Sequence, residues 1–565
     1  MFRVLCAIAV LAVAFVAAPA AAAAPADDAA SIVSAFAALP QGDGGNVVDP
    51  LLKGNAYPYS QAMLGEAALR TWRRDGDPAA LAFGERMLRW VSEHPSGPKP
   101  SFFALGATAR AFELLPTRSP VRDAVARWLI AFPVPTQELV DYHSNKDLVL
   151  AEALTTLCRL ALRPDTAAVC ATAAHLLDVH LTARAAGYSV GPSGRRMTIL
   201  VDPPYAPPAY QHLVLGYLAH IVQNAPRHDR AIERQLIAAA RGSVAIVAPD
   251  GDAAYWGRSQ EQSWAVVLGA YGLRVAASLD RDRAEAAQFR SVADAMVGRF
   301  DRVHRGGPYG VWIVPALRED PASRPPALDD YANLATYAGL TAVALTWLDL
   351  APVGRANGRG RPVAAVFDVG EDAFATVRRG DVWFAVREHW ARAHDGDLRS
   401  DFGLLAAERR GADGWRALVA VRPLTASGMD SGGPVLRTRS GQVGYPDGTA
   451  LRVDRHRAVI VTGGWRDAGG RLLRRGTFRF SAVPGGVRLS FPVRGGDRIE
   501  YSVFGGALSG TADGVRSERA RTTVSPGAVT IATAAGYASG DTSKLTRGTL
   551  SVTAPRTGRL TITVR

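Results

Sequence analysis

Two hydrophobic periods divide the chain. Between residues 28 and 352, apolar residues recur at three-to-four spacing and are interrupted by clusters of Pro, Gly and Asp, which predicts helices. After Gly360 the period changes to two, and Gly, Asp and Ser separate the apolar runs, which predicts strands. The twelve predicted helices span 28–38, 59–74, 78–94, 101–115, 119–131, 146–162, 166–182, 208–224, 229–245, 259–277, 282–300 and 330–350. The clearest predicted strands are 365–367, 382–386, 418–421, 458–461 and 560–564.

The connections between the predicted helices alternate in length and composition. Turns such as Arg74-Asp75-Gly76-Asp77 are short and polar, whereas loops rich in Tyr, Trp, His, Pro and Gly enter every second helix. Short turns make tight antiparallel hairpins, so the long loops gather at one end of the assembly. We therefore expect an (α/α)6 toroid of six hairpins with alternate helices inside. An open helical solenoid is the alternative.

The full domain organisation follows from these periods and from the N-terminus. Residues 1–24 combine a short basic start, an apolar centre and a small-residue exit, which is typical of a cleaved secretory signal peptide. An uncleaved N-terminal membrane anchor is the alternative. We expect the toroid over 25–352, a linker over 353–362 and an antiparallel β-sandwich over 363–565. The uncharged run Tyr331–Leu348 contains Asn and Thr and is interpreted as a buried helix, so we expect a secreted protein without a membrane span.

Composition adds two constraints. The chain has 565 residues and only three cysteines, so it is no disulfide scaffold. Signal cleavage would leave Cys158 and Cys170, which lie on either side of a predicted helical turn. These two cysteines can form a disulfide or remain as two buried thiols. Of the net charge of +13, residues 361–565 supply 31 basic against 19 acidic residues. No aromatic-basic module accompanies this surplus, so we expect an acidic polysaccharide as the partner rather than nucleic acid, and a monomer.

Two segments before predicted inner helices concentrate polar and aromatic chemistry. Tyr142-His143-Ser144-Asn145-Lys146-Asp147 precedes one of them, and Asp250-Gly251-Asp252 followed by Tyr255-Trp256-Gly257-Arg258-Ser259-Gln260-Glu261-Gln262 precedes another. Together with the order of toroid and sandwich, these segments resemble the toroid-type polysaccharide lyases: the chondroitin, hyaluronate and xanthan lyases, the alginate lyases and the heparinase II/III-like group. Alginate-type members carry an Asn-His pair where this chain has His143 and Asn145. The resemblance implies β-elimination on a uronate-containing glycan.

A lyase of this kind must neutralise a carboxylate, remove the neighbouring C5 proton and protonate the departing O4. The candidates are Asn145 or Arg258 for the carboxylate, His143 or Tyr255 for the proton, and a tyrosine for the leaving oxygen. We expect no cofactor and no metal in this reaction. The candidate substrate-binding residues are Tyr142, Trp256, Glu261, Tyr331, Asn333 and His394.

Each candidate also has a structural interpretation, and two other functions remain open. His143, Asn145 and the pair Asp329-Asp330 can serve as helix caps, and the aromatic residues Tyr255 and Trp256 can serve loop packing. The loop with His389 and His394 has an irregular spacing that favours a polar connection or a substrate contact over a metal site. The alternative functions are a toroid glycoside hydrolase with a carboxylate pair drawn from Asp252, Glu261, Asp329 and Asp330, and a non-catalytic wall- or glycan-binding protein.

Overall fold

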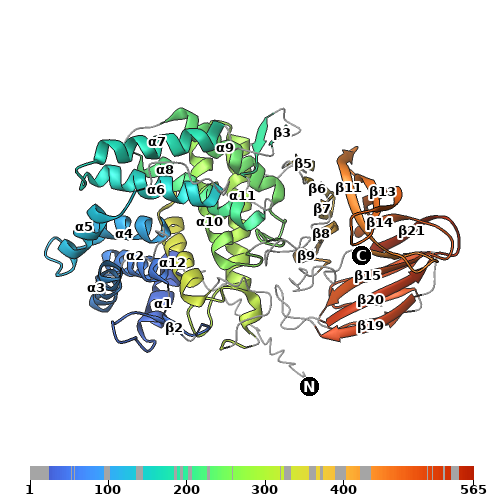
Figure 1. Cartoon of the computed structure of the whole chain (residues 1–565), viewed down its shortest axis with the longest axis horizontal. Coiled ribbons are helices and arrows are strands. Elements are labelled where there is room, and N and C mark those ends of the chain that lie inside the picture. Colours follow the sequence, from blue (N-terminus) through green and yellow to red (C-terminus); the bar gives the residue numbers. More distant parts are fainter. Residues whose placement is uncertain are drawn as a thin grey trace, which may run out of the picture.

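The computed structural model contains an N-terminal helical half and a C-terminal half of antiparallel strands (Figure 1). It describes residues 24–565 except 53, 56, 95–101, 135–143, 183–187, 191–194, 201–206, 226–228, 258, 319, 323–332, 355–363, 369–372, 389–401, 420–433, 506, 512, 526–528 and 536–545. The helices are α1 Pro25–Ala37, α2 Pro58–Asp75, α3 Pro78–Glu93, α4 Phe102–Leu114, α5 Arg122–Ala131, α6 Ser144–Leu160, α7 Thr166–Thr182, α8 Pro208–Asn224, α9 Arg230–Ile246, α10 Ser263–Leu279, α11 Arg283–Val303 and α12 Leu334–Leu350.

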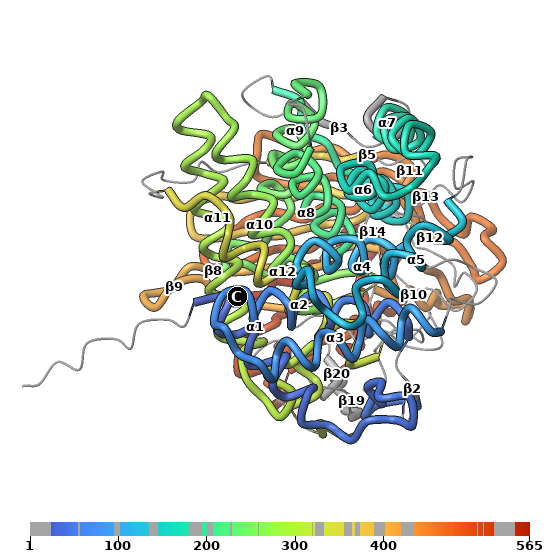
Figure 2. The backbone as a smooth tube through the Cα atoms, turned by 90° about the vertical axis from the view of Figure 1, so that its left-hand side faces the viewer, coloured from blue at the N-terminus to red at the C-terminus, as the bar shows by residue number. Residues whose placement is uncertain are grey.

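The helices form the closed ring that the loop pattern predicts. The even-numbered helices pack side by side from α2 through α4, α6, α8 and α10 to α12, and α12 packs back onto α2. The odd-numbered helices lie outside, each against an inner partner, and α1 completes the sixth hairpin against α12 (Figure 2). Closure of the ring excludes the open solenoid. All six inner helices begin at the same end, which is called the mouth below.

Small residues let the inner helices approach closely. A Cβ at Gly216 of α8 would lie 2.8 Å from the Leu268 side chain of α10, and one at Gly272 would lie 2.6 Å from Leu215. Helix α12 is buried along Leu334–Leu348, in agreement with its uncharged sequence. In the described part of the chain, no helix has the length and apolarity needed to cross a bilayer.

The strands form two large antiparallel sheets. The five-stranded sheet runs in chain order through β5 Ala364–Asp368, β6 Ala373–Arg379, β7 Val382–Arg387, β8 Gly403–Gly411 and β9 Gly414–Ala417. The twelve-stranded sheet has the order β16-β17-β18-β21-β14-β13-β12-β11-β10-β15-β20-β19. Its strands are β10 Val435–Arg437, β11 Val443–Asp454, β12 Ala458–Arg466, β13 Leu472–Val483, β14 Gly486–Val493, β15 Arg498–Gly505, β16 Ser509–Thr511, β17 Gly514–Arg516, β18 Arg521–Ser525, β19 Val529–Ala535, β20 Thr546–Thr553 and β21 Gly558–Val564.

The five-stranded sheet is a middle layer, buried on both faces (Figure 1). On β7, Val382, Phe384 and Val386 join the core shared with the twelve-stranded sheet. Trp383 and Ala385 point the other way, into a cluster with the loop that enters α10. Because side chains alternate along β7, one face of this strand packs on the large sheet and the other on the helical half. The mouth of the toroid faces the strands.

Three smaller features complete the comparison with the sequence. β9 ends at Ala417, and a bend at residues 418 and 419 occupies the start of the predicted strand 418–421, whose last two residues lie outside the described part of the chain. Cys158 and Cys170 form a disulfide with a Cα–Cα distance of 5.2 Å, which links α6 to α7. Short strand pairs also occur in loops that enter inner helices: β1 Val48–Asp49 with β2 Gly54–Asn55, and β3 Tyr188–Val190 with β4 Arg196–Thr198.

Candidate functional site

The first turns of three inner helices converge on one serine at the mouth of the toroid. The Ser259 hydroxyl donates a hydrogen bond to the hydroxyl of Tyr210 on α8 at 3.2 Å and lies 3.4 Å from the hydroxyl of Tyr337 on α12. The Trp264 ring of α10 lies between the two tyrosines, with centroid distances of 5.8 and 6.0 Å. Since these side chains come from α8, α10, α12 and the loop before α10, their convergence depends on closure of the ring.

The backbone around this serine is strained. Ser259 and Glu261 have φ values of 59° and 58°, and Gly257 has a φ of 83°. Only glycine adopts this left-handed region without cost, so each of the two non-glycine residues adds about 1–3 kcal/mol of strain. The Glu261 amide donates to the Ala254 carbonyl at 2.8 Å, which holds the loop in this shape. Strain of this kind gathers at functional sites, so it marks the 257–261 loop as a candidate.

An aromatic strip extends from the mouth over α2 and α4. Tyr57 is 40% exposed and stacks on Tyr59 at 5.3 Å, and Tyr59 in turn packs against Phe103 at 6.3 Å. Burial raises the pKa of Tyr59 to about 12, although a hydrogen bond with Thr336 acts in the other direction. Tyr59 therefore stays protonated at neutral pH, and its hydroxyl can donate a hydrogen bond. An exposed tyrosine backed by a second one offers a flat apolar surface with polar edges, which suits a sugar ring.

A buried charge network lies under the mouth and holds four inner helices together. Arg110 of α4 donates to both carboxylate oxygens of Glu66 on α2 and also binds Glu152 on α6, which is 3.0 Å from His220 of α8. Arg70 lies 2.9 Å from Glu66, so two arginines balance the charge of the two carboxylates. Burial lowers the pKa of His220, which is therefore neutral. Despite burial, Arg110 and His220 lower the pKa of Glu152 to about 2.

The Tyr255 side chain packs into the junction with the strands, a placement that does not fit the proton-transfer role expected of it. Its side chain is buried against Trp383 of β7, and its hydroxyl donates to the Ile246 carbonyl at 2.8 Å. Burial raises the Tyr255 pKa well above its usual value. Trp256 is also buried, against Phe374 and the guanidinium of Arg387. Both residues pack the helical half onto the five-stranded sheet, so the placement favours the structural interpretation for each.

The remaining described candidates stay at the mouth. Asn145 lies in the first turn of α6 and is buried. Asn333 caps α12, since its side-chain oxygen accepts a hydrogen bond from the Thr336 amide at 2.7 Å. Glu261 is buried in the strained loop. Tyr142, His143, Arg258, Tyr331 and His394 lie outside the described residues, as do His389, Asp329 and Asp330.

Sequence reasoning missed Tyr59, Tyr210, Tyr337 and the role of Ser259. The three tyrosines lie inside the first turns of α2, α8 and α12, whereas most of the predicted site residues lie at the entries to α6, α10 and α12. The sequence does contain one signal for these residues. Each of these three inner helices has a tyrosine in its first turn, and the first turns of the inner helices meet at the mouth.

A second polar cluster joins the helical half to the strands. Arg299 of α11 binds Asp250 at 2.6 Å and Asp252 at 3.0 Å, and the Asp250 amide donates to Glu408 of β8 at 3.0 Å. Burial and the neighbouring Asp250 raise the pKa of Glu408 well above its usual value, whereas Arg299 and a hydrogen bond from Glu408 lower that of Asp250. Asp250 and Glu408 thus share one proton. Within the described residues, no group of three or more His, Cys, Asp or Glu side chains is arranged to hold a metal ion.

Comparisons with known proteins give distant structural similarity only. No protein-family profile and no curated protein sequence matches the chain. An α-1,6-mannanase from Salegentibacter sp. HEL1_6 has a TM-score of 0.41 at 12% identity and covers 58% of this chain and 99% of its own. A heparin-specific unsaturated glucuronyl hydrolase has a TM-score of 0.41 at 12% identity, with 57% and 95% covered, and a polysaccharide lyase has 0.38 at 14%, with 57% and 97% covered. Similarity at this level assigns no activity to the chain.

Proposed function

We propose that the protein is an exported lyase that cleaves a uronate-containing polysaccharide by β-elimination at the toroid mouth. The observation that carries the proposal is the pair of hydroxyls, from Tyr210 and Tyr337, that converge on Ser259 at 3.2 and 3.4 Å. Hydroxyl groups placed in this way can donate a proton to oxygen in a reaction that also takes a proton from carbon. The strained loop and the exposed Tyr57 at the same end add support.

The roles in this reaction divide between tyrosines and residues at inner-helix starts. Asn145 or Arg258 binds the substrate carboxylate, and the positive ends of the inner helices strengthen that binding. His143 removes the C5 proton, the role for which Tyr255 was the alternative. A protonated tyrosine such as Tyr59 or Tyr337 then donates to O4 as the C4–O4 bond breaks. Tyr57 supports a sugar ring beside the reacting bond.

The hydrolase alternative has weaker support in the described residues. It requires two carboxylates that reach the glycosidic bond. Asp252 is paired with Arg299 at 3.0 Å, and Glu261 is 5% exposed in the loop. The ion pair with Arg299 engages Asp252 at the junction with the strands, which leaves Glu261 as the one described candidate carboxylate at the mouth.

The first test is a panel of uronate polymers, assayed in parallel for ultraviolet absorbance and for new reducing ends. β-Elimination creates a double bond conjugated with the carboxylate, so both signals should rise together. A neutral polymer serves as the control and should give neither. Reducing ends without absorbance would instead support the hydrolase. Binding without either signal would support a glycan-binding protein.

A further inference from the structure

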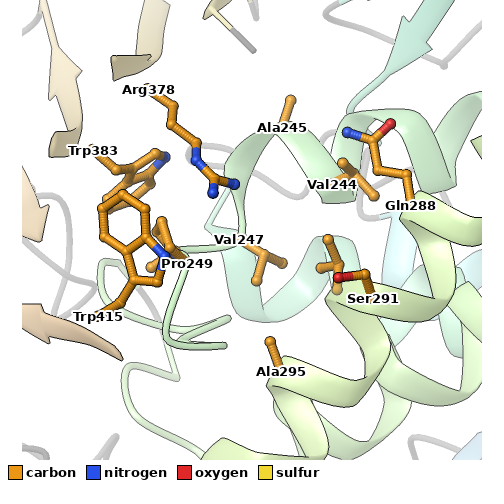
Figure 3. A pocket seen from close by; sticks show the side chains of 12 residues that line it. Val244, Ala245, Val247, Pro249, Gln288, Ser291, Ala295, Arg378, Trp383 and Trp415 are labelled. Atoms are coloured by element: carbon orange, nitrogen blue, oxygen red, sulfur yellow. The ribbon is translucent and has the colours of Figure 1, made fainter. Parts of the chain in front are cut away.

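A cavity of about 170 Å³ lies between the outer helices and the five-stranded sheet (Figure 3). The end of α9 and one side of α11 form one wall, and strands β6, β7 and β9 form the other. A cavity of about 150 Å³ is known to hold a six-membered carbon ring, so this one has room for a single sugar ring.

The strand wall combines one cation with two indole rings. Arg378 of β6 extends toward the helices beside Trp383 and Trp415, and its guanidinium carbon lies 5.0 Å from the Trp415 ring centroid (Figure 3). Trp383 is buried and held by Tyr255 at 5.5 Å, whereas Trp415 is half-buried. The tryptophans thus present a fixed apolar surface next to a planar cation.

The charge of Arg378 is not compensated in the part of the chain that the structure describes. No described residue forms a hydrogen bond or an ion pair with its guanidinium, although the side chain is half-buried. Burial lowers the Arg378 pKa, with Arg410 adding to the effect and Glu408 opposing it. Glu408 shares a proton with Asp250 and so provides little negative charge. A half-buried cation in this position favours an anionic ligand.

The helix wall supplies neutral polar groups at the other side of the cavity. Gln288 and Ser291 of α11 line it (Figure 3). Among the described residues, neither side chain has a hydrogen-bond partner, so both are available to sugar hydroxyls. A few convergent polar groups against an apolar wall are typical of a small-molecule site.

We propose that this cavity binds one carboxylated sugar ring, a uronate, as a subsite separate from the toroid mouth. The guanidinium of Arg378 binds the carboxylate with two parallel hydrogen bonds, a geometry that suits arginine better than lysine. The C–H-bearing face of the ring packs on Trp415, and Gln288 and Ser291 bind hydroxyls. The subsite goes beyond the proposed lyase reaction, because it concerns binding without chemistry and does not require the mouth to be active.

The test measures binding to the full-length mature protein by ligand-observed NMR. The probes are glucuronate, glucose as the same ring without a carboxylate, and sulfate as an anion without a ring. A ligand of this size binds with a Kd of about 1 mM. We expect glucuronate to bind at that level and glucose and sulfate to bind at least tenfold more weakly.

Variants locate the binding. Arg378→Ala should weaken glucuronate binding at least tenfold, and Arg378→Lys should weaken it by a smaller factor. Arg416→Ala is the matched control, because it removes the same charge next to Trp415 from an exposed side chain paired with Asp413. Equal binding by Arg378→Ala and the parent protein would overturn the proposal, and so would sulfate binding as tight as glucuronate binding. Arg378→Ala should leave kcat on a susceptible uronate polymer unchanged, which separates this subsite from the proposed lyase site.

Discussion

Tyr210 and Tyr337, on two different inner helices, both bring their hydroxyl groups within 3.4 Å of the Ser259 hydroxyl. Neither tyrosine is close to the other in the sequence, and each lies in the first turn of its helix. Ring closure from α2 to α12 creates this relationship. It brings three hydroxyl groups from different parts of the chain together at the mouth.

Removing either hydroxyl should therefore reduce turnover while the fold survives. We expect Tyr210→Phe and Tyr337→Phe each to lower kcat about 10²-fold or more, the usual cost of losing a general acid or base. Tyr271→Phe is the control, since that hydroxyl binds Gln223 at the opposite end of α8, 2.7 Å away. Full activity in both mouth variants would remove these tyrosines from the mechanism.

The buried charge network should be essential for stability rather than for chemistry. Arg110→Met leaves Glu66 and Glu152 buried without their main partner, which should cost about 3–5 kcal/mol of unfolding free energy. Arg159→Met breaks the partly exposed pair with Glu113 and should cost at most about 1 kcal/mol. Urea unfolding of the two variants measures both values. Similar losses in the two variants would contradict the role assigned to the network.

A buried histidine should make stability depend on pH. Burial lowers the pKa of His304 from its ordinary value of 6.5 to about 3, while its ring remains hydrogen-bonded to the Trp312 carbonyl. The unfolded chain therefore takes up a proton below pH 6.5 that the folded chain refuses. The His304 contribution falls by about 1.4 kcal/mol per pH unit between those two values.

The matched variant separates this effect from opposing groups. The pKa of Asp280 is raised to about 6, so this residue adds stability as the pH falls. The pH dependence of the unfolding free energy of the parent protein alone therefore does not isolate the contribution of His304. The comparison is between the parent and His304→Gln in urea unfolding at pH 6.5 and pH 5. The variant should lose less stability over that interval. Parallel slopes would indicate that His304 takes up its proton in the folded state.

The contribution of Glu408 to stability should change with pH in the direction opposite to that of His304. Its pKa is raised in the folded state, so its contribution is fully present below about pH 4.5 and is lost as the pH rises through the folded value. Glu408→Gln keeps a neutral group that can donate to Asp250, whereas Glu408→Ala removes the contact. We expect thermal unfolding at alkaline pH to show that Glu408→Gln is more stable than the parent protein and that Glu408→Ala is less stable than both. A Gln variant that loses as much stability as Ala would argue against a shared proton.

The helical half was predictable because two independent signals agree there. The three-to-four period places each helix, and the alternation of short polar turns with long aromatic loops identifies the inner ones. The middle layer was harder to predict. The run Val382–Val386 is apolar at every position, which indicates burial on both faces, but nothing local in the sequence identifies the helical half as the covering partner.

The candidate site stays a prediction, and the structure adds a physical reason to prefer some of its residues over others. Tyr255 precedes an inner helix, as the loop argument requires, yet its ring turns toward Trp383 because that pairing buries both aromatic side chains at the junction. Tyr337 is one turn inside α12, where the sequence resembles the rest of a buried helix. Side-chain direction within a loop depends on tertiary packing, which the spacing of residues does not encode.

The most direct test of the proposed reaction is the mass of the products formed in ¹⁸O-labelled water. β-Elimination adds no water, so cleavage of a susceptible uronate polymer should give new non-reducing ends that are unsaturated and lighter by one water molecule. No ¹⁸O should be incorporated during bond cleavage. Hydrolysis would instead incorporate one ¹⁸O atom per cleaved bond and give saturated ends, and that result would contradict the lyase assignment.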